Sequence, residues 1–273
     1  MKDRILVFTD LDGTLLDPRT YSFEPARPAL KMLDKLGIPL IICTSKTRPE
    51  VEGVRAVLGN TDPFIVENGG AIFIPDGYFS IEFPATGMDS GYQVIELGTA
   101  YSRILGVFSK MKERLPGRLR GFSDMTVEEV ARLTGLSFDE AAQAKKREYD
   151  EPFLLDEPGA NLQIAKKMAE SAGLSLTQGR FFHLTGENDK GRAVRMVKDI
   201  YSRAHGIIPR TIGLGDSPND LPLLENVDFP VLVQKPGGRY EPSIRLDNLI
   251  LAPGEGPVGW CASVSELVGR LAG

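Results

Sequence analysis

Two aspartates stand two positions apart where an apolar run near the start of the chain ends. The stretch "VFTDLDGTLLD" carries Asp10 and Asp12, followed directly by Gly13 and Thr14. Two carboxylates at this spacing can work on a phosphate ester, one as the nucleophile and the other as acid and base. The glycine lets the chain turn sharply, because it has no Cβ. A lone pair of this kind is common in loops, so its meaning depends on what lies near it.

Polar side chains also follow two later apolar runs. Thr44 and Ser45 come directly after "IPLIIC", and Asp216 and Asp220 lie in "GDSPND", just after "TIGL". The runs are short, rich in branched apolar residues and not alternating, which indicates parallel strands buried on both faces. In an open parallel sheet, ligands bind beyond the carboxyl ends of the strands. We therefore expect all of these polar groups to meet at one end of the sheet.

Helices are predicted between the strands. Apolar residues recur at helical spacing in 29–36 and in 51–58, and a glycine ends each pattern as a C-cap. The alternation returns late in the chain, with a predicted helix at 191–204 and predicted strands at 211–214, 230–233 and 248–252. This order favours an α/β fold built on a doubly wound, Rossmann-like parallel sheet.

The middle of the chain is organised differently. Its strand candidates are short and separated, and two of its predicted helices begin with capping boxes at Thr126–Glu129 and Ser137–Glu140. This pattern is typical of an α+β domain. We expect such a domain to be inserted at 85–186, between core segments 1–84 and 187–273.

The composition argues against several classes of protein. With 273 residues, of which 42% are hydrophobic and 25% charged, the chain can bury a large core. No apolar run approaches the ~18 residues of a membrane span, and no export signal is visible. A formal net charge of -5 without a long basic run argues against nucleic-acid binding. Cys43 and Cys261 suit neither a disulfide framework nor a zinc site, so we expect a cytoplasmic protein with neither membrane nor nucleic acid as a partner.

Together, these motifs resemble those of the haloacid dehalogenase-like superfamily of phosphotransferases. "DLDGT" is similar to the first motif of that superfamily, Thr44 to the second, Lys190 in "ENDKG" to the third and "GDSPND" to the fourth, in the same order. The resemblance implies a phosphomonoester hydrolase in which Asp10 attacks phosphorus and forms an aspartyl-phosphate. It implies that Asp12 acts as acid and then as base, while Thr44 and Lys190 bind phosphoryl oxygens.

Clustered carboxylates would repel a phosphate unless a cation lies between them. Hard oxygen ligands combined with phosphate favour Mg²⁺. We expect the Asp10 carboxylate, the Asp12 carbonyl and Asp216 to hold this ion, with Asp220 in a supporting or water-mediated position. The alternative for Lys190 is a solvated lysine in the first turn of a helix.

Further stretches resemble the mannosyl-3-phosphoglycerate phosphatase family, namely "TSKTRPEV", "PFIVENGGAIFIP", "KREYDEPFLL" and "RFFHLTGENDKGRAV". This resemblance implies hydrolysis of mannosyl-3-phosphoglycerate to the compatible solute mannosylglycerate, with the insert as a cap domain that sets specificity. Such a phosphorylated sugar-glycerate would find polar partners at Ser45, Lys46, Arg48, Glu67, Asn68, Arg147, Glu151, Arg180 and His183. Asp150 departs from the family, in which we expect a serine, and this difference could alter the sugar pocket.

Several alternatives are open on the sequence alone. Mannosyl and glucosyl substrates differ in one hydroxyl orientation, which the sequence does not separate. Other enzymatic alternatives are a phosphatase for another sugar phosphate and a phosphomannomutase. A phosphoacceptor receiver domain also combines strand-end acids with Mg²⁺, but it is smaller and carries its metal acids as an adjacent pair. Arg147 could belong to the solvated end of a helix, and His183 could be a packed histidine.

Overall fold

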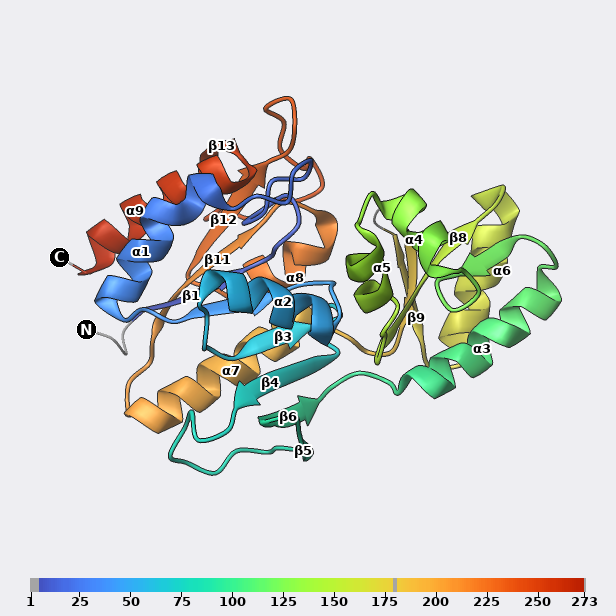
Figure 1. Cartoon of the computed structure of the whole chain (residues 1–273), viewed down its shortest axis with the longest axis horizontal. Coiled ribbons are helices and arrows are strands. Elements are labelled where there is room, and N and C mark those ends of the chain that lie inside the picture. The colour runs from blue at the N-terminus through green and yellow to red at the C-terminus, as the bar shows by residue number, and fades with distance from the viewer. Residues whose placement is uncertain (1–4, 179–180, 273) are drawn as a thin grey trace.

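The larger of two lobes is built around a nine-stranded sheet (Figure 1). The computed structural model describes residues 5–178 and 181–272. Within these ranges the strands lie in the spatial order β13 (Ile250–Glu255), β12 (Phe229–Gln234), β11 (Arg210–Gly215), β1 (Ile5–Thr9), β2 (Leu40–Cys43), β3 (Phe64–Val66), β4 (Ala71–Pro75), β6 (Tyr92–Glu96) and β5 (Gly87–Asp89). The helices of this lobe are α1 (Arg27–Leu36), α2 (Arg48–Leu58), α7 (Lys190–His205), α8 (Leu221–Leu224) and α9 (Gly256–Ala272), with single turns η1 (Glu24–Ala26) and η2 (Pro218–Asp220).

The strands from β13 to β3 run parallel, and β4, β6 and β5 extend the sheet in the antiparallel sense. The predicted α/β fold with a doubly wound parallel sheet is therefore confirmed. The strands predicted in the first and last thirds of the chain lie close to their expected positions.

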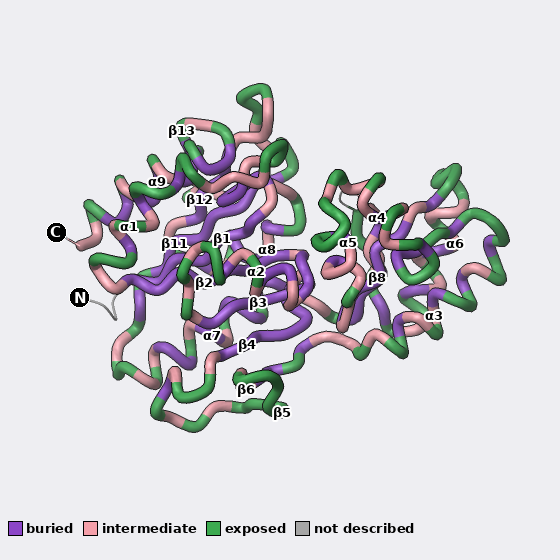
Figure 2. The backbone as a smooth tube through the Cα atoms, in the orientation of Figure 1, coloured by how far each residue is buried: buried purple, intermediate pink, exposed green. Residues whose placement is uncertain are grey.

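Side chains of β1 alternate between two hydrophobic cores, one on each face of the sheet. Ile5 and Val7 belong to the core shared with α1 and α9, whereas Leu6 and Phe8 belong to the core shared with α7 and α8. Figure 2 shows the buried strands as a continuous purple band between half-exposed helices. Because helices cover both faces, the strand is buried at every position, and its first four residues are apolar.

Local sequence fixes the ends of the first two helices. Gly37 and Gly59 close α1 and α2 in the left-handed conformation, with φ of 62° and 68°. Thr47 begins α2 with a capping box, since its side chain accepts from the Glu50 backbone while the Glu50 carboxylate accepts from the Thr47 backbone. These caps hold the short connection that follows β2, where Thr44 lies.

The smaller lobe, which we call the cap, is built on a four-stranded antiparallel sheet. Its strands are β7 (Leu119–Gly121), β8 (Asp150–Leu155), β10 (Phe182–Thr185) and β9 (Ser175–Gln178), in that spatial order. Helices α3 (Tyr101–Arg114) and α6 (Pro158–Ser171) pack on this sheet, and α5 (Phe138–Ala144) packs against α4 (Val127–Thr134) and against α2 of the core. Both predicted capping boxes are present, at Thr126 and Ser137.

The start of the cap differs from the expected boundary at residue 85. Strands β5 and β6 lie beyond that boundary, yet they pair with each other and with β4 in the core sheet. Every residue of β5 is exposed, and β6 is only partly buried. Neither strand has the continuous apolar run that marks the central strands, so no local pattern predicts that the core sheet extends this far.

Both cysteines carry free thiols. Burial raises the pKa of the Cys43 thiol above its ordinary value, so Cys43 packs as an apolar group behind the sheet's carboxyl end. Among residues 5–178 and 181–272, no helix combines the length and the apolar character that crossing a membrane requires.

Trp260 of α9 provides a test of how this helix is held on the sheet. Its side chain is fully buried, and its Nε1 donates to Thr9 Oγ1 at 3.0 Å. We expect Trp260→Ala to lower the free energy of unfolding by about 3–5 kcal/mol, because it leaves a cavity beside β1. The control Val258→Ala, at an exposed position of the same helix, should change it by less than about 0.5 kcal/mol. Urea unfolding followed by circular dichroism compares them, and equal stability of the two variants would contradict the account.

Candidate active site

The carboxyl ends of β1 and β11 bring three aspartates together. Asp10 follows β1, while Asp216 and Asp220 follow β11, and one carboxylate oxygen from each lies within 4.8 Å of the others. All three residues are buried. The two strands are direct neighbours, and Asp10 N donates to Leu214 O at 3.0 Å. Motifs about 200 positions apart in the sequence thus meet where the sequence predicts.

Lys190 joins two of these aspartates. It is the first residue of α7, and its Nζ donates to Asp10 Oδ1 at 2.9 Å and to Asp220 Oδ1 at 2.6 Å. Its side chain is only 1% exposed, so the alternative of a solvated lysine is wrong. Burial lowers the pKa of Lys190, but the two carboxylates outweigh this effect and raise it above its ordinary value. The ammonium group therefore stays charged at neutral pH.

The cluster sets three carboxyl groups beside the single ammonium group of Lys190. Burial, reinforced by the neighbouring aspartates, raises the pKa of Asp216 to about 8, and it raises the pKa of Asp10 to about 7 even though Lys190 opposes the shift. A cation among these oxygens would relieve the repulsion, and an all-oxygen donor set suits Mg²⁺. The residues present therefore fit the predicted ion.

The loop after β1 backs directly onto this cluster. Gly13 has φ of 77°, and a Cβ at this position would lie 2.9 Å from Asp216 Oδ2. Thr14 Oγ1 donates to Asp216 Oδ1 at 3.4 Å. Both the left-handed conformation and the close approach require glycine, so the turn predicted from "DLDGT" is also what lets the loop reach Asp216.

Asp12 occupies a different environment from Asp10. Its Oδ2 lies 3.1 Å from Lys46 Nζ, and its side chain is 44% exposed. Its Oδ1 is shielded from solvent and has no hydrogen-bond partner among the described residues. One oxygen of Asp12 is thus fixed by a cation while the other is available to a substrate atom.

Thr44 and Ser45 lie at the end of β2, the neighbour of β1. Thr44 is fully buried, and its Oγ1 accepts from Lys46 N at 3.3 Å, which leaves the hydroxyl hydrogen available for a phosphoryl oxygen. The Ser45 carbonyl accepts from Arg147 Nη1 at 2.8 Å. The end of β2 therefore carries the Thr44 hydroxyl and, through the Ser45 carbonyl, also contacts the cap.

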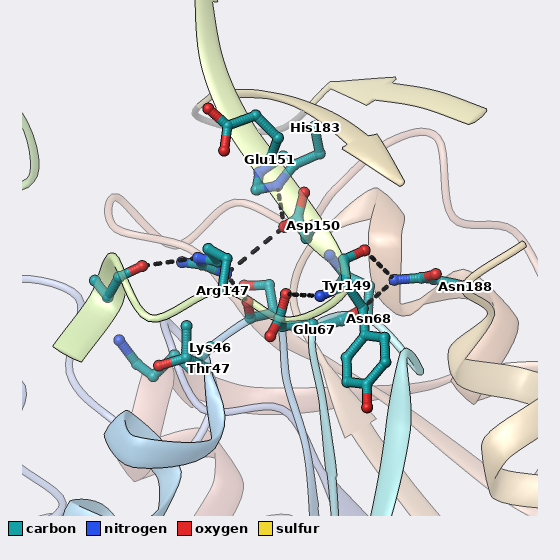
Figure 3. A network of polar contacts seen from close by, with 12 residues as sticks. Lys46, Thr47, Glu67, Asn68, Arg147, Tyr149, Asp150, Glu151, His183 and Asn188 are labelled. Carbon is teal, nitrogen blue, oxygen red and sulfur yellow. Dashed lines mark hydrogen bonds and ion pairs between the residues drawn. The ribbon is translucent and has the colours of Figure 1, made fainter. Parts of the chain in front are cut away.

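Charged side chains connect the core to the cap (Figure 3). Besides Ser45 O, Arg147 contacts Glu50 Oε2 at 3.8 Å and Asp150 Oδ2 at 3.6 Å. His183 Nδ1 lies 2.7 Å from the same Asp150 oxygen. Arg147 is almost fully buried, so it is not a solvated residue at a helix end. His183 therefore contacts a carboxylate and is not a histidine packed only among aromatic rings.

Glu67 contacts both the cap and the linker that returns from the cap to the core. Its two carboxylate oxygens accept from Glu148 N and Tyr149 N, each at 2.9 Å. In the returning linker, Asn188 Nδ2 donates to Glu67 O at 2.9 Å and to Tyr149 O at 3.0 Å (Figure 3). Burial raises the pKa of Glu67 to about 8, with Arg147 opposing the shift. The structure thus places the Glu67 carboxylate against the backbone of the cap segment that precedes β8.

Two predicted substrate residues lie in other contacts. Arg48 pairs with Asp89 of the sheet edge at 3.1 Å and with Glu148 of the cap segment that precedes β8 at 3.4 Å. Glu151 is adjacent to Asp150 in β8, so the two side chains point to opposite faces of the cap sheet. Glu151 accepts from the Tyr101 hydroxyl of α3, on the face away from His183.

Asn68 and Arg180 are the remaining residues that the sequence predicts for the site. Asn68 accepts from Asn219 Nδ2 at 3.1 Å, beside the Asp220 turn. Arg180 lies outside the described residues. Sequence reasoning missed Glu50 and Asn188 as parts of the site. The spacing of Thr47 and Glu50 signals a capping box, but nothing in the sequence signals the contact of Glu50 with Arg147.

The sequence is similar to known phosphatases over nearly its whole length. Residues 7–82 match the haloacid dehalogenase-like hydrolase family. The chain is 48% identical to a glucosyl-3-phosphoglycerate/mannosyl-3-phosphoglycerate phosphatase of Methanococcoides burtonii, over 97% of each chain. It is 42% identical to a phosphatase of the same name from Persephonella marina, over 98% of each chain.

The fold is also similar to solved structures. One is a phosphatase of the haloalkanoate superfamily from Bacteroides thetaiotaomicron, with a TM-score of 0.67 and 17% identity over 99% of this chain and 96% of the other. At that identity the likeness concerns the fold alone, whereas the two sequence relatives establish the family. The chain therefore belongs to the haloacid dehalogenase-like hydrolases and, within them, to the family of phosphatases represented by these two relatives.

Proposed function

We propose that the protein is a Mg²⁺-dependent phosphatase that hydrolyses mannosyl-3-phosphoglycerate to mannosylglycerate and phosphate, and that it also accepts the glucosyl analogue. The observation that carries this proposal is the 48% identity, over 97% of both chains, with a relative named for both substrates. The buried site at the sheet's carboxyl end supports it, because nucleophile, lysine and candidate metal ligands are assembled there. A receiver domain and a phosphomannomutase lack this support.

Asp10 is the nucleophile of the proposed reaction. Lys190 holds its Oδ1 at 2.9 Å and supplies positive charge beside the phosphoryl group. Attack of the Asp10 carboxylate on phosphorus forms an aspartyl-phosphate and breaks the bond to the glyceryl oxygen, which divides one difficult step into two. Mg²⁺, when bound, supplies charge neutralisation between the carboxylates and the phosphoryl oxygens.

Asp12 transfers the protons in both steps. Its Oδ1, which has no partner among the described residues, donates a proton to the departing glyceryl oxygen. The resulting carboxylate then takes a proton from the water that attacks the aspartyl-phosphate, which releases phosphate and restores Asp10. Thr44 donates its hydroxyl hydrogen to a phosphoryl oxygen during both steps.

Lys46 is the residue best placed to recognise the glycerate carboxylate. Its Nζ lies 3.1 Å from Asp12 Oδ2, on the side of the site where the leaving group departs. Burial lowers the pKa of Lys46, but Asp12 and Glu50 outweigh this and raise it, so the side chain stays charged. Arg147 is already committed to Glu50, Asp150 and a backbone carbonyl, which makes it a residue that positions the cap.

The role of Asp10 as the nucleophile can be tested by substitution. Asp10→Asn should reduce phosphate release by roughly 10³-fold or more while the protein stays folded, because an amide is a poor nucleophile and a weaker metal ligand. Released phosphate is measured with saturating Mg²⁺, and thermal unfolding checks the fold. Substantial turnover by a folded Asp10→Asn variant would rule out covalent catalysis through Asp10.

The role of Asp12 as the proton donor can be tested in the same way. Asp12→Asn should impair hydrolysis of alkyl phosphates more than hydrolysis of 4-nitrophenyl phosphate, since an alkoxide needs a proton to depart and a nitrophenolate does not. The ratio of kcat/KM for the two esters, compared between variant and parent, is the quantity to measure. Equal losses on both esters would remove Asp12 from the role of acid.

The identity of the substrate can be tested with a panel of phosphate esters. Mannosyl- and glucosyl-3-phosphoglycerate should be hydrolysed with a kcat/KM well above those for 3-phosphoglycerate, mannose phosphates and phosphoglycolate. Lys46→Met should reduce kcat/KM for the glycosylated esters by roughly ten- to a hundredfold, through loss of a charge-assisted hydrogen bond, and should reduce kcat/KM for 4-nitrophenyl phosphate by less. Flat activity across the panel, or faster turnover of a hexose phosphate, would contradict the proposed substrate.

A further inference from the structure

A cavity of about 240 Å³ lies between the core and the cap, next to Lys46. The core contributes the loop after β1 and one side of α2, and the cap contributes α5 and the connection that precedes it. The lining of the cavity includes Tyr21, Phe23, Lys46, Gly53, Glu140 and Gln143.

The cavity opens on the side of the site where the leaving group departs. Lys46 lines it, and Lys46 Nζ is 3.1 Å from the carboxylate of Asp12, the proposed proton donor. Whatever is esterified to the phosphate must extend past Asp12 in this direction. The cavity on the other side of α2, lined by Arg55 and Tyr92, has neither Lys46 nor any residue of the cap in its wall.

The lining suits a sugar ring. Tyr21 and Phe23, with aliphatic neighbours, offer apolar surface to the C–H face of a hexose, while Lys46, Glu140 and Gln143 offer hydrogen-bonding groups to its hydroxyls. At about 240 Å³ the cavity is smaller than pockets that enclose a whole drug-sized ligand. It is suited to one part of the substrate rather than to all of it.

We propose that this cavity is the subsite for the hexosyl ring of the substrate, with Tyr21 and Phe23 against its apolar face and Glu140 and Gln143 at its hydroxyls. The inference rests on the proposed function and extends it to named residues. Both lobes form the wall, and Thr47 Oγ1 donates to Gln143 O at 3.1 Å across the boundary. A bound sugar therefore contacts the core and the cap together.

Gly53 gives an independent indication that this space is used. It lies inside α2, where glycine costs about 1 kcal/mol relative to alanine. A Cβ added there would meet only Gln143 Oε1, at 3.9 Å, so a side chain could be accommodated without a clash. The helix thus carries a destabilising residue at a position that needs no glycine for its own fold, and the glycine keeps the cavity open.

Gly53→Leu tests the subsite, because the new side chain would extend into the cavity. We expect KM for mannosyl-3-phosphoglycerate to rise roughly tenfold or more. Kinetic constants for 3-phosphoglycerate, which lacks only the sugar, and for 4-nitrophenyl phosphate should stay within about twofold of the parent. The matched control is Ala56→Leu, which enlarges a residue of the same helix that lines the other cavity and should leave all three substrates unaffected.

The outcomes separate the subsite from the function. If the parent enzyme prefers the glycosylated ester but Gly53→Leu leaves its KM unchanged, the subsite is wrong and the proposed function stands. If the parent shows no such preference, the proposed substrate fails and the subsite fails with it. Gly53→Ala, which adds a single methyl, is the second variant, and a KM for the glycosylated ester that does not rise from glycine to alanine to leucine would also overturn the subsite.

Discussion

The site depends on the ion pairs that Lys190 makes with Asp10 and Asp220. Buried charges are strongly unfavourable unless they are paired, and Lys190 is the cation that contacts these two carboxylates in the described chain. The pairing requires β1 beside β11 and the start of α7 above both strands. Gly215 belongs to the same requirement, since a Cβ there would lie 2.4 Å from Asp220 Cβ. The sheet order, the helix position and the glycine at the strand end all serve this one arrangement.

In the proposed function, the core and the cap contact different parts of the substrate. Core residues at the ends of strands surround the place where the phosphoryl group would bind. The cap contributes charged groups at a distance from Asp10, through Arg147, Asp150 and His183. These groups are held to the core by Glu50 and by the hydrogen bonds that Glu67 accepts from the cap backbone. In the proposed function, substrate choice therefore depends on how the cap lies on the core.

The sequence predicts the central strands and the site residues on them, because both depend on local signals. An unbroken apolar run ending in Asp10 is enough to place that residue at the carboxyl end of a buried strand, and the spacing of Thr126 and Glu129 is enough to start a helix. Contacts between distant segments leave no such signal. The pairing of Glu50 with Arg147 and the extension of the core sheet by β5 arise only once the chain has folded.

Orientation is the other property that spacing alone did not provide. Glu151 and Asp150 are neighbours in a matched stretch, but strand alternation sends Glu151 to Tyr101 on the far face of the cap sheet and Asp150 towards Arg147. Arg48 is likewise drawn to Asp89 and Glu148. Predicting which of two adjacent polar residues faces a ligand requires the register of β8, which its sequence does not fix.

The most direct test of the account is the stereochemical course of the reaction at phosphorus. A phosphorothioate analogue of the substrate, made chiral at phosphorus with two oxygen isotopes, would be hydrolysed in water that carries the third isotope, and the configuration of the released thiophosphate determined. Attack by Asp10 followed by attack of water comprises two in-line displacements, each of which inverts the phosphorus centre. The account predicts overall retention of configuration. Inversion would show that water attacks the substrate directly, and it would contradict the role assigned to Asp10 and to the lysine that holds it.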